Sequence, residues 1–126
     1  MLFRVEIREK LLDIILENVR TNFPREEILL LRGKIRKGVI EITDIVIPPL
    51  ATSGLGFSVF PASMLPMDYS LLGSVHSHPS GNLTPSIEDL NHFFGRIMMI
   101  VVYPFKRENA AVFNKAGKKI EMRLIE

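Results

Sequence analysis

The spacing of apolar residues near the start of the chain predicts an amphipathic helix. From about residue 5 to residue 19, apolar side chains recur every three or four positions, which places them on one helical face. The positions in this stripe are Ile7, Leu11, Leu12, Ile15 and Val19. Asn22 and Pro24 follow the stripe and mark the end of the predicted helix.

Strand patterns dominate the rest of the chain. Apolar, β-branched runs at residues 28–35 and 39–47 flank Lys37-Gly38, which predicts a hairpin. The run at 97–103 is uniformly apolar and predicts a central strand buried on both faces. The other predicted elements are a small-residue loop at 51–56, a short strand at 55–60, a turn or single helical turn at 61–66, a strand at 71–77, a helix at about 85–94, and a second hairpin of residues 110–114 and 119–125.

The order of these elements, α-βββ-α-βββ, predicts the fold class. It is typical of an α/β (α+β) protein with a mixed β-sheet flanked by helices. A length of 126 residues suits a single domain, residues 1–126, that is large enough to bury a core.

Composition narrows the class of protein further. With 47% hydrophobic and 24% charged residues, the chain resembles an ordinary globular protein. No apolar run reaches the roughly 18 residues of a membrane span, and the N-terminus lacks a signal peptide's apolar stretch. We therefore expect a cytoplasmic protein that does not enter a membrane. The net charge of +2 and the lack of aromatic residues among the basic ones argue against a nucleic-acid partner.

Candidate metal ligands gather between the strand at 71–77 and the second helix. His76 and His78 lie two residues apart, so on a strand both project from one face. Asp89 follows at the start of the predicted helix, for which Thr84 suits the N-cap. Because the chain has no cysteine, a metal must bind imidazole, carboxylate or water. Two imidazoles and one carboxylate form a common ligand set for a catalytic zinc.

Each part of this motif also has an explanation without chemistry. A His-x-His pair taken alone is more often incidental than metal-binding, and Ser86-Ile87-Glu88-Asp89 matches a capping box that starts a helix. The third histidine, His92, is better explained as a partly exposed helical residue or an outer-shell group than as a ligand. The combination of paired histidines, turn loop and helix start favours the metal site.

The same residues resemble the signature of a known family. His76-Ser77-His78-Pro79, followed after six residues by Ser86 and then by Asp89, resembles the motif H-S/T-H-P-x(6)-S-x-x-D of the JAMM, or MPN+, metalloproteases. The order of helices and strands is also similar over essentially the whole chain. The resemblance implies the MPN fold, which is related to that of cytidine deaminases, and small archaeal JAMM proteases are the most similar in size.

The family motif also contains a glutamate before an apolar strand that ends in glycine. Residues 24–33 fill that place, with Gly33 as the glycine and both Glu26 and Glu27 as candidates. The family spacing to Gly33 implies Glu26, and only one of two neighbouring strand residues can face the metal. Leu29 departs from the family pattern, because many eukaryotic members have a glycine at that position.

The resemblance implies a mechanism and a substrate. His76, His78 and Asp89 would hold one Zn²⁺ per chain. Glu26 would pass a proton from water to the leaving amine, and Ser86 would hydrogen-bond the oxyanion. The implied reaction is hydrolysis of the amide bond after the C-terminal Gly-Gly of a ubiquitin-like modifier joined to a lysine of a conjugate.

Several alternatives stay open. The protein processes a sulfur carrier or another ubiquitin-like precursor, or it belongs to a RadC-like branch, or it is a non-catalytic MPN scaffold. The scaffold explanation is weakened because inactive members typically lose ligands, and all are present in this chain. A homodimer is also open, with Phe93, Phe94, Met64 and Met67 as candidate interface residues, although such positions more often belong to a core.

Overall fold

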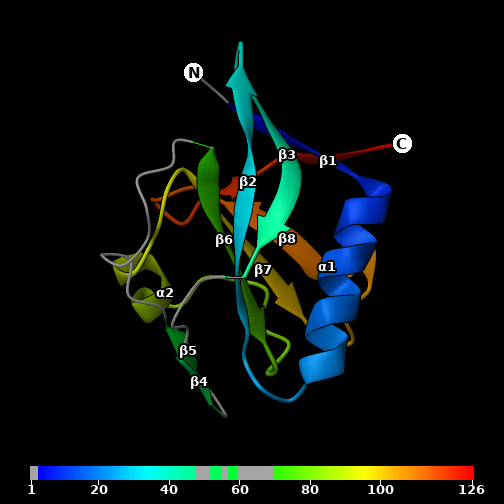
Figure 1. Cartoon of the computed structure of the whole chain (residues 1–126). Helices are drawn as coiled ribbons and strands as arrows, with labels where there is room; N and C mark the ends of the chain where they lie inside the picture. Colours follow the sequence, from blue (N-terminus) through cyan, green and yellow to red (C-terminus); the bar gives the residue numbers. More distant parts are fainter. Residues whose placement is uncertain (1–2, 48–51, 55–56, 60–69) are drawn as a thin grey trace.

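The computed structural model describes residues 3–47, 52–54, 57–59 and 70–126. The elements in chain order are β1 (Arg4–Arg8), α1 (Glu9–Asn22), β2 (Ile28–Arg36), β3 (Val39–Val46), β4 (Thr52–Gly54), β5 (Phe57–Val59), β6 (Leu71–His78), α2 (Ile87–Asn91), β7 (Ile97–Val102), the 3-10 helix η2 (Arg107–Asn109), β8 (Ala110–Phe113), β9 (Lys119–Ile120) and β10 (Met122–Ile125). Figure 1 shows their arrangement.

The main sheet has eight strands in the order β10-β1-β3-β2-β6-β7-β8-β9. Strands β9 and β10 stand at opposite ends of this order, although only Glu121 separates them in the chain. Residues 119–120 pair with β8, and residues 122–125 pair with β1. One continuous segment therefore bridges both ends, and the sheet must curl until these ends meet. Strands β4 and β5 form a separate two-stranded sheet.

Two apolar clusters cover the main sheet. Helices α1 and α2 lie on opposite sides of the sheet (Figure 1). The larger cluster joins buried residues of α1 to β1, β2, β3, β6, β7 and β8, and its α1 members are Leu12, Ile15, Leu16 and Val19. A smaller cluster lies on the other face, where Phe93 and Leu83 pack against β7 and β8. All six residues of β7 are buried, which confirms the predicted central strand.

The hairpin predicted around Lys37-Gly38 is also confirmed. Strands β2 and β3 are antiparallel, and the turn residues have positive φ angles of 46° at Lys37 and 82° at Gly38. Glycine adopts this left-handed backbone without a steric penalty. The predicted end of the first helix is confirmed as well, since α1 ends at Asn22.

The start of the first predicted helix is wrong. Residues 4–8 form strand β1, and α1 begins only at Glu9. Val5 and Ile7 are fully buried at the two-residue period of a strand, but Ile7 also continues the helical stripe. The partners of this strand, β3 and β10, lie far away in the sequence. The local pattern therefore favoured a helix over a strand that distant pairing stabilises.

The second predicted hairpin is only half correct. Lys119 and Ile120 pair with β8 as predicted, but from Met122 onward the chain pairs in parallel with β1. The predicted helix at 85–94 is shorter, because α2 spans Ile87–Asn91, and its N-cap is Ser86 instead of Thr84.

The predictions for the middle of the chain have mixed outcomes. Part of the predicted loop at 51–56 is strand β4, and part of the predicted strand at 55–60 is β5. The predicted turn at 61–66, and Met64 and Met67, lie outside the described residues. Within the described ranges, no helix is long and apolar enough to cross a membrane.

Replacing Gly73 by alanine is expected to destabilise the sheet beside the histidines. An alanine Cβ at this position of β6 would stand 1.9 Å from the carbonyl oxygen of Ile97 in β7. The strands must separate to admit it, which we expect to cost about 3 kcal/mol in urea denaturation. The control is Gly81→Ala, whose added Cβ meets nothing within 4 Å and is opposed only by the φ of +83°, at about 1 kcal/mol. Equal losses in the two variants would contradict the clash.

Candidate metal centre and active site

The candidate site lies where the end of β6 meets the start of β2 and the helix α2. The antiparallel pairing of β2 with β6 ends with Ile28 opposite His76, and the same register extended by two residues would set Glu27 opposite Ser77 and Glu26 opposite His78. The 3.1 Å bond from the Ser77 N–H to the Glu27 carbonyl agrees with this register. Opposite residues share a face of the sheet and neighbours alternate. Glu26 therefore shares a face with His76 and His78, and Glu27 faces the other way.

Asp89 connects the two histidines. Nε2 of His78 lies 3.0 Å from Asp89 Oδ2, and Nδ1 of His76 lies 3.7 Å from Asp89 Oδ1. Each of the three side chains is between 10% and 14% exposed, so water screens them weakly. The structure thus brings the three predicted ligands together.

The second nitrogen of each imidazole is held by another protein group. Nε2 of His76 lies 3.0 Å from the hydroxyl of the buried Ser74, and Nδ1 of His78 lies 3.0 Å from the carbonyl oxygen of Asn82. Because a carbonyl only accepts, Nδ1 of His78 must donate, which leaves Nε2 of a neutral ring as an acceptor facing Asp89. Two acceptors 3.0 Å apart require a proton or a cation between them.

The pKa values of the chain alone reflect this arrangement. Burial lowers the pKa of His76 to about 4, so its ring is neutral at pH 7. Burial also opposes the charged form of His78, but hydrogen bonds to Asp89 and the Asn82 carbonyl outweigh it and raise the pKa of His78. Burial opposes ionisation of Asp89, yet the bonds to His78 and Ser86 lower the pKa of Asp89 to about 2. His76 and Asp89 are therefore in the neutral and ionised forms that bind a metal, whereas the charged form of His78 has to release its proton to bind one.

The two neighbouring glutamates have different surroundings. Burial raises the pKa of Glu26, and the charges that act on it belong to His78, Asp89 and Glu88. Burial also raises the pKa of Glu27, but its hydrogen-bond partner is Asn22 of α1. Of the two candidates, Glu26 therefore stands beside the predicted ligands. The raised pKa makes the half-buried Glu26 carboxylate a stronger base, which suits its predicted role in proton transfer.

Ser86 forms the capping box that the sequence also suggested. Its hydroxyl accepts from the Asp89 N–H at 3.0 Å, and Asp89 Oδ2 accepts from the Ser86 N–H at 2.8 Å. The exposed hydroxyl keeps its own hydrogen for a second partner. The cap therefore orients Asp89 without removing the donor that the predicted oxyanion role requires.

The third histidine stays outside the site. His92 is the exposed C-cap residue of α2, and its Nδ1 donates to the carbonyl of Glu88 at 3.0 Å. This placement agrees with the interpretation of His92 as a helical residue that is not a ligand.

The donor set fits a zinc ion, although the side chains are not opened around one. In the part of the chain that the structure describes, no group of three His, Cys, Asp or Glu side chains is already arranged to hold a metal. Zinc bonds of about 2.0–2.1 Å place tetrahedral ligands about 3.3 Å apart. The contacts of 3.0 and 3.7 Å from Asp89 to His78 and His76 bracket that separation. Each imidazole also has the outer hydrogen bond that orients a ligating histidine.

Three contributors to the site were not predicted from the sequence: Ser74, the Asn82 carbonyl and the Ser77 hydroxyl. Ser74 has a sequence signal, because it precedes His76 by two residues on a strand and so shares its face. A backbone carbonyl has no residue-type signal. Ser77 alternates with the two histidines along β6, and its hydroxyl accepts from the Glu27 N–H at 2.7 Å.

Solved structures with similar folds include a JAB1/MPN domain protein from Archaeoglobus fulgidus. It is 31% identical with a TM-score of 0.71, and the match covers 98% of this chain and 100% of the other. A second structure, described as JAMM, a metalloprotease-like zinc site in the proteasome and signalosome, is 30% identical with a TM-score of 0.68 over the full length of both chains. A solution structure from Desulfitobacterium hafniense, 21% identical with a TM-score of 0.70, shares the fold. It covers 97% of this chain and 93% of its own.

Sequence comparison agrees with these structures. A protein of Haloferax volcanii named "probable metalloprotease" is 30% identical over 97% of this chain and 80% of its own length. The model of the prokaryotic homologues of the JAB domain matches residues 8–115. The chain belongs to the JAB/MPN family of metalloprotease-like proteins, among its prokaryotic homologues.

Proposed function

We propose that this protein is a zinc-dependent isopeptidase that cleaves a ubiquitin-like modifier from its conjugates. The observation that carries the proposal is the contact of Asp89 of α2 with His76 and His78 at the end of β6, close enough to Glu26 for their charges to act on it. A metal site with three protein ligands leaves room for water, as in hydrolytic zinc enzymes.

The residues of the chain divide the chemistry between them. His76, His78 and Asp89 would hold Zn²⁺, which when bound supplies Lewis acidity and an acidified water. Glu26 takes the proton of the attacking water and delivers it to the leaving amine, a role that its raised pKa supports. The Ser86 hydroxyl donates to the carbonyl oxygen as negative charge develops there.

The substrate class rests on the family resemblance. A related structure is described by its zinc site in the proteasome and signalosome, and the shared motif favours an amide bond to a ubiquitin-like protein. We propose cleavage after the modifier's C-terminal Gly-Gly, at its bond to a lysine. Processing of a sulfur-carrier precursor is the alternative within the same chemistry, and side-by-side assays of a precursor and a lysine conjugate distinguish the two.

Metal removal is expected to abolish the activity reversibly. The protein would be incubated with a conjugate of a ubiquitin-like modifier, and cleavage would be followed with and without a strong zinc chelator. We expect cleavage to stop with the chelator and return when zinc is restored, because the proposed zinc would acidify the attacking water.

The same samples test the fold. Zinc that binds only the folded state raises the unfolding temperature by mass action, so the chelated protein should melt earlier than the zinc-loaded protein. Cleavage that continues in the chelator would overturn the metalloprotease proposal. A protein that binds zinc but cleaves neither conjugates nor precursors would favour the scaffold alternative.

A further inference from the structure

We infer that Ser77 and Glu27 are positioning residues that fix the backbone carrying the proposed base Glu26. The inference rests on the proposed function, since it takes the proton-transfer role of Glu26 from there. Neither residue touches the predicted ligand atoms, because both lie on the opposite face of the sheet from His76 and His78.

The first contact is a hydroxyl that takes the place of a sheet hydrogen bond. In a regular antiparallel pair, two opposite residues exchange both backbone N–H···O bonds. The Ser77 N–H donates to the Glu27 carbonyl at 3.1 Å, but the Glu27 N–H donates to the Ser77 hydroxyl at 2.7 Å. Ser77 is 2% exposed, so water has little access to replace its hydroxyl. The β2–β6 ladder therefore ends on a side chain, one residue from Glu26.

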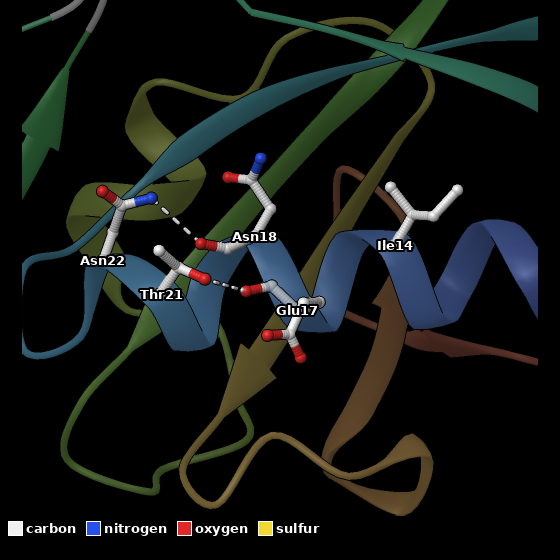
Figure 2. A pocket seen from close by; sticks show the side chains of 5 residues that line it. All are labelled: Ile14, Glu17, Asn18, Thr21 and Asn22. Atoms are coloured by element: carbon white, nitrogen blue, oxygen red, sulfur yellow. Dashed lines mark hydrogen bonds between the residues drawn. The ribbon is translucent and has the colours of Figure 1, made fainter.

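The second contact anchors the Glu27 side chain to the end of α1. With its amide oriented so that the NH₂ group faces Glu27, Asn18 donates to both carboxylate oxygens, at 3.3 Å to Oε2. Glu27 also hydrogen-bonds the side chain of Asn22. Figure 2 shows both asparagines on one turn of α1, where the Asn22 amide donates to the Asn18 carbonyl at 2.9 Å.

These contacts hold Glu27 at its backbone and at its carboxylate. Since adjacent residues on an extended chain point to opposite faces, fixing Glu27 toward α1 also fixes Glu26 toward the metal site. Ser77 stands between the two predicted histidine ligands, so the same hydroxyl links the ligand strand to the base across 50 residues of sequence. A displacement of about 1 Å in such a group can cost on the order of a hundredfold in rate.

The test compares Ser77→Ala with Ser77→Thr, and Asn18→Ala with Thr21→Ala. Threonine restores a hydroxyl acceptor at position 77. Thr21 lies on the same turn of α1 as Asn18, but its hydroxyl donates to the Glu17 carbonyl at 2.9 Å, which makes it a matched control. Zinc affinity, kcat and KM on the conjugate would be measured, together with hydrogen exchange of the Glu27 amide by NMR in the zinc-free protein.

We expect Ser77→Ala to lose on the order of tenfold in kcat, with KM and zinc affinity unchanged and faster exchange at the Glu27 amide. Ser77→Thr should restore both kcat and the slow exchange of the Glu27 amide. Asn18→Ala should lower kcat, and Thr21→Ala should have the kcat of the parent. Val112→Ala shortens a buried side chain of β8, so its kcat shows the effect of lost stability alone. An unchanged kcat in Ser77→Ala, or an equal loss in Val112→Ala at matched stability, would overturn the inference.

Glu26→Gln, assayed in parallel, separates this inference from the proposed function. If Glu26→Gln stays fully active, the proposed function fails and the inference fails with it. If Glu26→Gln is inactive but Ser77→Ala and Asn18→Ala are as active as the parent, only the positioning role is refuted.

Discussion

The Glu26→Gln protein is expected to bind zinc as the parent does and to lose at least about a hundredfold in kcat. Glutamine keeps the shape of the side chain but has no site for the proton of the attacking water. Zinc binding should persist, because the expected ligands are His76, His78 and Asp89. Single-turnover cleavage of a conjugate, with zinc content measured on the same sample, checks both parts.

Glu88→Gln is the matched control for this variant. Glu88 lies exposed in the first turn of α2, and its charge helps to raise the pKa of Glu26. Its removal should leave kcat at its plateau value but move the acid limb of the pH–rate profile to lower pH, because the base then ionises more easily. Full turnover by Glu26→Gln would show that another group moves the proton.

Asp89→Asn is expected to weaken zinc binding by at least about a hundredfold. Mutating a group that only hydrogen-bonds a metal ligand already lowers metal affinity by about 10–100-fold. Asparagine keeps the size of the side chain and an oxygen that can accept from the Ser86 N–H, so α2 should keep its cap. What disappears is the negative charge between the two imidazoles. Zinc affinity measured against a competing chelator, with circular dichroism for the fold, separates these effects.

His92→Ala is the control for the Asp89 variant. His92 is the exposed C-cap residue of the same helix, and the hydrogen bond described for its side chain goes to the Glu88 carbonyl. Zinc affinity should therefore match the parent. If His92→Ala lost zinc and Asp89→Asn retained it, the predicted ligand set would have to exchange these two residues.

Local pattern predicted the elements whose stability is local or whose burial is complete. The apolar run of β7 and the helical stripe of α1 both appear in the structure. The sequence pattern missed strand β1 because Ile7 fits both the apolar spacing of a helix and that of a strand. Residues 4–8 form a strand because they pair with β3 and β10. The change of pairing partner at Glu121, from β8 to β1, was missed for the same reason. The residues around Glu121 carry no signal for which strand pairs with residues 122–125.

The sequence likewise predicted the side chains of the candidate site but not all of the groups that hydrogen-bond them. The motif spacing predicted that His76, His78 and Asp89 would gather, and the structure brings them into contact. It did not predict the Asn82 carbonyl, which sets the tautomer of His78 and depends only on the path of the backbone. The roles of His76, His78 and Asp89 as zinc ligands stay predictions that the zinc-affinity measurements test.

The strand pairing at the two ends of the sheet also bears on how the protein is made. Strand β1 precedes the other strands of the sheet in the chain, but its neighbour β10 follows all of them. Until residues 122–125 emerge, one edge of β1 has no β10 to pair with, and open edges invite pairing with other chains. The curled sheet therefore cannot close until β10, the last of its strands in chain order, has left the ribosome.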